Sequence, residues 1–482
     1  MLLSMLFSFS RRPNSRVLLF ACFWTFFGYF GGSLLDLKPT ETSPWPGPTP
    51  PPPPPRTVTV QAPSEAVTVV ANVEIETRKA EVVEPMVLNG PPTASFADNL
   101  RSDVQYITSW PGAGFTNDVM TYMNLVYLAL LTERVPILPF FTPSHITEGG
   151  KYDVPSIDFG DVFDVDRLRK ELGKPVLEWW QVKDRNNQSL DALGCWNVWQ
   201  AVLSKNTAPH WSKAPEALKL DISYTIAPTW IRLIPTGDNL HMTFTALMSL
   251  AFPRKRKQAI QQAIQQPALS PILKASLPPS EQLLCFDNLY WLSTVEPHEM
   301  EHDYSPAWRF VGQHFHWAPR VEALARTHLR QAFGLGPAAP IPPYIAIHVR
   351  HGDFTTWCDG VPALDCFAPL IDYVKAVAAV RAELLASSGL DVEHVIVTSD
   401  ETDSDWWAAV DALGWAYPDH EGTVAKHGKW YPMLIDGAIQ SGAHGFVGTD
   451  QSTVSMISAR RIQAWRGGTA RMVKWGRWAE QG

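Results

Sequence analysis

The chain has two regions in which apolar strand segments alternate with helices. In the first region, residues 104–110 (VQYITSW) have the pattern of a strand, and PGAGFTND follows as a glycine-rich turn. Apolar residues then recur at helical spacing over 117–135, and a second strand is predicted at 136–141. Strand, glycine turn, helix and strand form a βαβ unit, which predicts a parallel sheet.

The second region repeats this alternation from residue 344 onwards. Strands are predicted at 344–350, 394–401 and 445–448. Helices are predicted at 373–388, 403–415, 433–443 and 449–465. We therefore expect an α/β protein with two Rossmann-like domains that face each other across a cleft, the first at 101–325 and the second at 326–482.

Polar side chains follow the predicted strands of the second region at their carboxyl ends, where open α/β sheets bind ligands. They form three clusters, His348/Arg350/Asp353, Thr398/Ser399/Asp400 and Thr449/Ser452/Thr453. The guanidinium of Arg350 fits phosphate oxygens bidentately, and Ser452 and Thr453 open a helix whose free amides attract anions. A structural ion pair between Arg350 and Asp353, and simple helix capping by Ser452 and Thr453, are the alternatives. Both features at strand ends of one domain favour a diphosphate ligand.

The first hundred residues lack the alternation of apolar strand segments and helices that the two later regions have. Residues 17–35 carry no charge, and at about 1.5 Å per residue they just span a hydrocarbon core. Arg11, Arg12 and Arg16 precede this stretch, which places the tail 1–16 in the cytosol by the positive-inside rule. The apolar run is long for a signal peptide and no small-x-small cleavage site follows, so we expect an uncleaved signal anchor.

Residues 36–100 are expected to form a stem, because a proline run at 43–56 favours extended polyproline II and the remainder is of low complexity. The resulting topology is that of a single-pass type II protein of the Golgi or endoplasmic reticulum membrane with its folded part in the lumen. In the lumen, Asn187 in Asn-Gln-Ser could carry a glycan.

The spacing of the cysteines and the net charge limit which metal sites, disulfides and partners we expect. No two of the 5 cysteines form a Cys-x-x-Cys pair, which disfavours a structural zinc site. Cys358 and Cys366 are expected to form a disulfide in an oxidising compartment, and Cys195 with Cys285 is a further candidate pair. A net charge of −8 argues against nucleic acid as a partner.

Three segments resemble the GDP-fucose protein O-fucosyltransferase superfamily. HVRHGDF is similar to the family's H-x-R-x-x-D-F signature, FVGTDQSTVS to its G-T/S-x-x-S-T-x-S element, and GAGFTND to its donor loop. The resemblance covers about Val104 to Arg461, and residues 143–305 do not align by eye. It implies a GT-B fold and an inverting fucosyltransferase that uses GDP-fucose, acts on a protein or glycan hydroxyl, and needs no metal or other cofactor.

The resemblance also implies roles for individual residues. Arg350 would contact the donor phosphates and act with Asn117 in catalysis, and Asp436 would face the nucleoside. The donor-binding residues implied by the three motifs are Gly112, Ala113, Gly114, Phe115, Asn117, His348, Val349, Arg350, Asp353, Asp436, Ser452, Thr453 and Val454. Some family members have a glutamate where this chain has Ala113, so the general base is unassigned, with Asp118 and Asp353 as candidates.

Two other functions are compatible with the sequence. A metal-dependent transferase of the GT-A kind needs an Asp-x-Asp pair, and the chain offers Asp164 with Asp166 and Asp403 with Asp405. Both pairs stand at predicted helix starts, where aspartate serves as a cap, so we expect no metal. The second alternative is a membrane-tethered protein that binds sugar nucleotides or glycans without turnover, which Ala113 keeps open.

Overall fold

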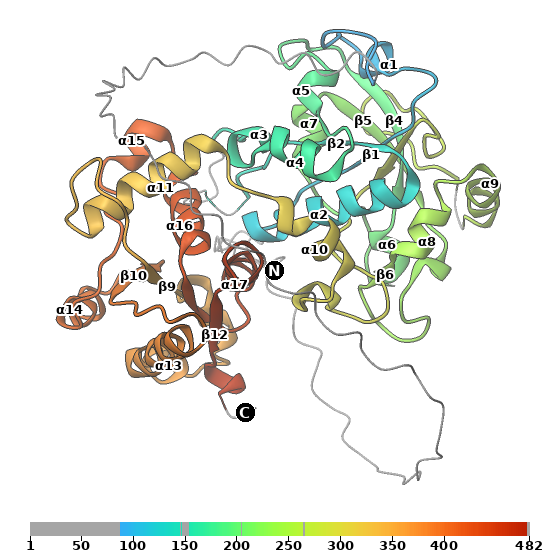
Figure 1. Ribbon diagram of the computed structural model, residues 1–482. Helices are drawn as coiled ribbons and strands as arrows, with labels where there is room; N and C mark the ends of the chain where they lie inside the picture. Colours follow the sequence, from blue (N-terminus) through green and yellow to red (C-terminus); the bar gives the residue numbers. More distant parts are fainter. Residues whose placement is uncertain (1–86, 145, 147–153, 204, 264–265, 480–482) are drawn as a thin grey trace, which may run out of the picture. The chain divides into compact units, whose positions relative to one another are not determined.

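The computed structural model describes residues 87–144, 146, 154–203, 205–263 and 266–479, and it is built around two parallel sheets (Figure 1). The first sheet has six strands in the order β3-β2-β1-β7-β4-β5, and all its pairings are parallel. Its strands are β1 Tyr106–Ser109, β2 Val135–Leu138, β3 Leu177–Glu178, β4 Asp191–Asn197, β5 Leu220–Ile226 and β7 Leu283–Phe286. A two-stranded parallel sheet joins β6 Met242–Thr243 to β8 Leu292–Ser293.

The second sheet has four parallel strands in the order β10-β9-β11-β12. They are β9 Tyr344–Val349, β10 His394–Ser399, β11 Gly445–Thr449 and β12 Thr469–Val473. The chain leaves β9 toward β10 on one side and later returns to β11 on the other side. The carboxyl ends of β9 and β11 therefore form a topological switch point, which is where doubly wound sheets bind their ligands.

Helices follow the strands in both halves. The helices of the first half are α1 Phe96–Asn99, α2 Phe115–Thr132, α3 Phe159–Val162, α4 Val165–Leu172, α5 Trp179–Val182, α6 Trp199–Val202, α7 Ala214–Ala217, α8 Phe244–Ser249, α9 Pro253–Gln262 and α10 Pro306–Phe310. Those of the second half are α11 Pro319–Ala332, α12 Ala363–Cys366, α13 Leu370–Ser388, α14 Ser404–Ala412, α15 Thr423–His427, α16 Tyr431–Gly442 and α17 Thr453–Arg466. Short 3-10 helices span Thr229–Ile231, Glu299–Glu301, Gly312–His314, Gly352–Trp357 and Gly476–Trp478.

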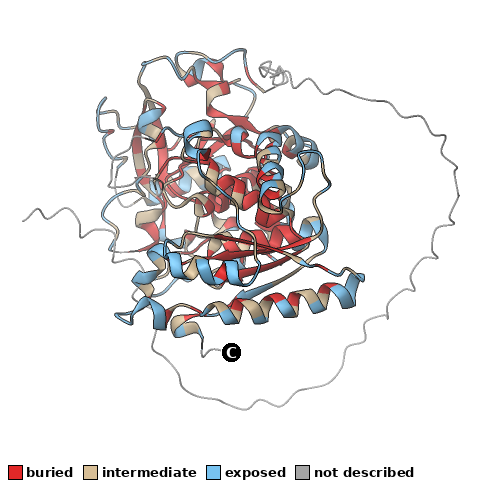
Figure 2. Cartoon of the chain, turned by 90° about the vertical axis from the view of Figure 1, so that its left-hand side faces the viewer, coloured by how far each residue is buried: buried red, intermediate tan, exposed pale blue. Residues whose placement is uncertain are grey.

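Helix α13 packs on one face of the second sheet, and α16 and α17 pack on the other, as right-handed crossovers require (Figure 1). Buried residues line the strands, whereas exposed residues lie on the outer sides of the helices (Figure 2). One buried cluster includes Phe163 and Trp317 together with Leu434 and Ile462, so a single core runs through both halves. Separate clusters cover the opposite face of each sheet.

Two predicted boundaries are wrong. Residues 88–100 were expected to belong to the stem, but Leu88, Phe96 and Leu100 are buried against the first sheet, because their apolar side chains cover one of its faces. The predicted domain boundary at 325/326 falls inside α11, which packs on α16 of the second half. Because α11 is one continuous helix that packs on α16, it belongs to the second half, which begins at Pro319.

The predicted cytosolic tail, the anchor at 17–35 and residues 36–86 of the stem lie outside the described residues. Among the helices that the structure describes, none is both long enough and apolar enough to cross a bilayer.

Candidate functional site

Arg350 stands directly after β9, and its guanidinium is held by two carboxylates. Its Nη1 donates to Asp400 Oδ2 at 2.7 Å and its Nη2 donates to Asp353 Oδ1 at 2.7 Å. A guanidinium has five N–H donors, so three remain available to a ligand. The Asp353 side chain is 60% exposed, and an ion pair this open contributes at most about 1 kcal/mol. A phosphate can therefore replace Asp353, while Asp400 keeps the fork oriented.

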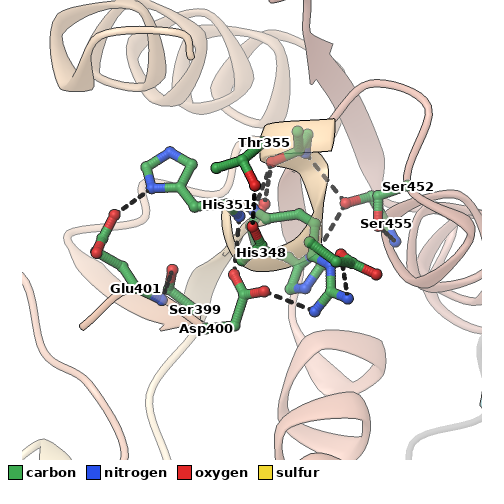
Figure 3. Close-up of polar contacts among 12 residues, drawn as sticks. His348, His351, Thr355, Ser399, Asp400, Glu401, Ser452 and Ser455 are labelled. Atoms are coloured by element: carbon green, nitrogen blue, oxygen red, sulfur yellow. Dashed lines mark hydrogen bonds and ion pairs between the residues drawn. The ribbon is translucent and has the colours of Figure 1, made fainter. Parts of the chain in front are cut away.

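Asp400 joins the ends of β9 and β10 (Figure 3). Its Oδ1 accepts from the His351 amide at 2.8 Å while its Oδ2 accepts from Arg350. Gly352 makes this contact possible, since a Cβ built there would lie 2.3 Å from Asp400 Oδ2. The glycine of the HVRHGDF segment is therefore required by the position of a carboxylate on the neighbouring strand.

His348 and Ser455 link the end of β9 to α17. His348 Nδ1 lies 2.8 Å from the Ser455 hydroxyl, which also accepts from the Thr449 amide at 3.0 Å. Burial, with a smaller contribution from Arg350, lowers the pKa of His348 to about 3. The imidazole is therefore neutral at physiological pH, and it positions the strand end without adding charge.

The Thr449 hydroxyl completes the junction between the two strands. It accepts from the Arg350 amide at 2.9 Å and donates to the His348 carbonyl at 3.1 Å. Tyr373 OH lies 2.8 Å from the same hydroxyl. Arg350 is therefore attached through its own backbone to the residue that ends β11, so the guanidinium and the start of α17 share one framework.

The start of α17 is capped and also reaches the first half. Ser452 is the N-cap, and its side chain accepts from the Ser455 amide. The amides of Thr453 and Val454 precede the first intrahelical hydrogen bond and so are free to meet an anion. Thr453 Oγ1 donates to Asn117 Oδ1 at 3.0 Å. Two residues predicted to contact the donor, separated by 336 positions in the sequence, thus lie in direct contact.

The glycine turn before α2 is the wall of the site that the first half contributes. Gly112 and Ala113 donate their amides to Asp118, and Gly114 is the N-cap of α2. The Phe115 ring packs on Phe141 and Trp430, with ring centroids 5.0 and 6.3 Å apart.

A pocket of about 320 Å³ adjoins this wall. Trp430 lines it and donates through Nε1 to the Pro155 carbonyl at 2.8 Å, so residues of both halves enclose the pocket. Its polar side chains include Ser156, Asp161 and His427. Trp430 also contacts Phe115, which directly follows Gly114, so Trp430 connects the pocket to the end of the glycine turn.

Three other residues singled out in the sequence have surroundings of their own. Asp436 on α16 faces His420, whose Nε2 lies 2.8 Å from its Oδ1, and burial raises the pKa of Asp436. The Val349 side chain is fully buried in the core behind the second sheet, so only its backbone can reach a ligand. Asn187 accepts from the Ser189 amide at 2.8 Å in an exposed turn.

Both candidate disulfides are present. Cys358–Cys366 closes the loop that follows Arg350, and Cys195–Cys285 joins β4 to β7. The first bond begins directly after the 3-10 helix Gly352–Trp357 that carries Asp353, and the second ties two neighbouring strands of the first sheet together.

Three of the four aspartates considered as metal ligands have structural partners for their carboxylates. Asp164 caps α4 by accepting from the Arg167 amide, and Asp166 pairs with Arg169. Asp403 caps α14 by accepting from the Asp405 amide. In the part of the chain that the structure describes, no three His, Cys, Asp or Glu side chains converge as a metal site requires.

Sequence reasoning missed three members of the site. Ser455 and Tyr373 hold the strand ends together, and Glu401 lies 2.5 Å from His351 Nδ1. Ser455 was detectable, because it is the last serine of the FVGTDQSTVS segment. Tyr373 had no such signal, since its contact with Thr449 joins residues 76 positions apart.

Comparison with known proteins gives structural similarities. No family model and no curated protein matches the chain. Among solved structures, the chain is similar to POFUT1 in complex with GDP-fucose, with 17% identity, a TM-score of 0.48 and coverage of 78% of this chain and 99% of that one. It is also similar to the fucosyltransferase NodZ from Bradyrhizobium, with 14% identity, a TM-score of 0.36 and coverage of 74% and 93%.

Proposed function

We propose that the protein is an inverting, metal-independent glycosyltransferase of the GT-B kind that transfers fucose from GDP-fucose to a hydroxyl of a protein or glycan. The observation that carries the proposal is the convergence of Arg350, the start of α17 and Asn117. The Arg350 amide bonds to Thr449 at the end of β11, and Asn117 bonds to Thr453 at the start of α17. The choice of GDP-fucose among sugar nucleotides rests on the three motif resemblances.

The site matches the charge that develops during glycosyl transfer. The acceptor oxygen forms a bond to the anomeric carbon as the bond from that carbon to the GDP oxygen breaks, and the acceptor proton passes to a base. Negative charge then builds on the departing diphosphate. A fixed guanidinium and free helix amides stabilise that charge best when they are preorganised, as Asp400 and Ser452 make them here. These groups do the work that a metal does in GT-A enzymes.

The direct test uses the full chain purified in detergent. GDP should bind in calorimetry, and GDP should be released from GDP-fucose slowly in water and faster with an acceptor. EDTA should leave this rate unchanged. Activity abolished by EDTA and restored by Mn²⁺ would favour the GT-A alternative. Tight GDP binding without any release or transfer would support the non-catalytic sugar-nucleotide-binding alternative.

Gly352→Ala should weaken GDP binding by at least about tenfold, since its Cβ would displace the Asp400 carboxylate that orients Arg350. Calorimetric titration with GDP measures the effect. Gly360→Ala is the matched control, because Gly360 lies in the same loop and also has a positive φ, but a Cβ there meets no atom within 4 Å. Equal loss of affinity in both variants would show that backbone strain, rather than Asp400, is responsible.

We also propose that residues 17–35 anchor the protein in the Golgi or endoplasmic reticulum membrane as a single-pass type II protein with a luminal catalytic part. The uncharged stretch and the three preceding arginines support this topology. Protease protection in microsomes tests it, since the folded part should be digested only after the membrane is opened.

A further inference from the structure

Asp118 is a buried carboxyl group that holds the glycine turn. It lies in the first turn of α2, and its side chain turns back past the start of the helix. One oxygen, Oδ1, accepts from the amides of both Gly112 and Ala113 at 3.0 Å. Only 1% of the residue is exposed, and Oδ2 has no hydrogen-bond partner among the described residues.

The turn is held on its other sides as well. Ser212 Oγ donates to the Pro111 carbonyl and Ser144 Oγ donates to the Ala113 carbonyl. Gly112 has no room for a side chain, because a Cβ there would lie 2.2 Å from the Trp211 carbonyl oxygen. Two serines therefore fix carbonyl groups of the turn, and among the described residues Asp118 is the one that accepts from the Gly112 and Ala113 amides.

The position of this turn decides where the ligand-facing residues stand. Asn117 stands three positions after Gly114, and its side chain meets Thr453 at the start of α17. Phe115 packs between Phe141 and Trp430 in the same stretch. A shift of the turn would therefore move Asn117 away from the amides of α17.

We propose that Asp118 is a positioning residue that fixes the glycine turn and so places Asn117 opposite the start of α17, and that it is not the general base. This inference deepens the proposed function and rests on it for the identity of the donor. Asp118 touches neither donor nor acceptor, because its carboxyl group is enclosed by the turn that it holds.

The electrostatics of the carboxyl group support this assignment. Burial raises the pKa of Asp118 to about 8, although the two amides oppose the shift. A general base must lie within hydrogen-bond reach of the acceptor hydroxyl, and the enclosed carboxyl group of Asp118 cannot reach it. A hydrogen-bond acceptor, in contrast, works in either protonation state.

Substitution by asparagine separates the two roles. Asp118→Asn keeps an oxygen for both amides, so it should keep most of kcat for transfer from GDP-fucose. Asp118→Ala removes that oxygen, and kcat/KM should fall by about 10²-fold with a rise in KM, since the donor wall is misplaced. Asp166→Ala, which removes an exposed first-turn aspartate of α4, is the control. An asparagine variant as inactive as the alanine variant would overturn the proposal and support a proton-transfer role.

A second readout does not depend on the donor. Hydrogen exchange of the Gly112 and Ala113 amides should be at least about tenfold faster in Asp118→Ala than in wild type, and close to wild type in Asp118→Asn. If hydrogen exchange of these two amides is unchanged in Asp118→Ala, Asp118 does not hold the turn, and the proposal fails even if GDP binds. If exchange is faster in Asp118→Ala but the wild-type protein does not bind GDP, Asp118 still holds the turn and the proposed function is refuted instead.

The pH dependence of stability supplies another test. The folded pKa of Asp118 lies above the ordinary aspartate value of 3.8, so the native state keeps a proton that the unfolded chain has lost, and stability falls as pH rises from about 4 to about 8. Burial raises the pKa of nearby Tyr122 and lowers that of His210, beside Gly112, to about 4, so both stay neutral between pH 5 and 8. The Tm of Asp118→Asn relative to wild type should therefore increase from pH 5 to pH 8, and a constant difference would contradict this.

Discussion

Arg350→Ala should lower the rate of transfer from GDP-fucose by about 10²–10³-fold, equivalent to about 3–4 kcal/mol of transition-state stabilisation. The guanidinium follows directly after β9, whose end is joined to the end of β11 by the hydrogen bond from the Arg350 amide to Thr449, and Asp400 orients it. Its side chain is 32% exposed and its ion pairs are open to solvent, so they contribute little to folding. The Tm should therefore change by less than about 3 °C.

Steady-state kinetics and a thermal melt measure the two quantities on the same sample. Arg185→Ala is the matched control, because Arg185 is also an exposed arginine in an ion pair, with Asp158, but it lies outside the site. Arg350→Lys should recover only a small part of the rate, since an ammonium cannot bridge two phosphate oxygens as a planar fork does. A large drop in Tm with little kinetic effect would identify Arg350 as part of a structural ion-pair network.

Removing the Cys195–Cys285 disulfide should lower the free energy of unfolding by about 4–5 kcal/mol, the largest stability effect that we expect. The bond closes a segment with a sequence separation of 90, and long loops lose the most entropy on cross-linking. It also lies at a weak junction of the first sheet. The pairing of β4 with β7 has only the register Trp196 with Phe286, next to the bridge.

The double variant Cys195→Ala/Cys285→Ala in urea unfolding measures this loss without leaving a buried polar group. The corresponding Cys358→Ala/Cys366→Ala variant should lose only about 2–3 kcal/mol, because its sequence separation is 8. This second variant should also weaken GDP binding, since Cys358 directly follows the 3-10 helix Gly352–Trp357, which carries Asp353. Equal losses of stability in the two double variants would contradict the loop-entropy explanation.

The elements of the second half were largely predictable from the sequence. The buried runs at β9, β10 and β11 and the glycine stop of α13 at Gly389 are local signals, and the structure has each of these elements close to its predicted place. In the first half, only the strands up to β2 were predicted. Strands β4 and β5 were missed because each has a polar residue at a buried position, Asn197 in β4 and Asp221 in β5. Asp221 is tolerated there because it accepts from the amides of Ile272 and Leu273, which no local pattern reveals.

The sequence by itself determined which residue types end the strands, because strand and helix signals depend on neighbours within a few positions. It placed Arg350, Ser452 and Asn117 at the ends of elements, where polar groups are available to a ligand. Only the tertiary structure decided that Asp400 orients Arg350, that Thr453 meets Asn117, and that Asp118 faces the turn rather than a substrate. Whether Asp400 meets Arg350 and Thr453 meets Asn117 depends on how the strands and helices pack together. Whether the Asp118 side chain is enclosed depends on its burial. Neither packing nor burial can be read from the spacing of residues in the sequence.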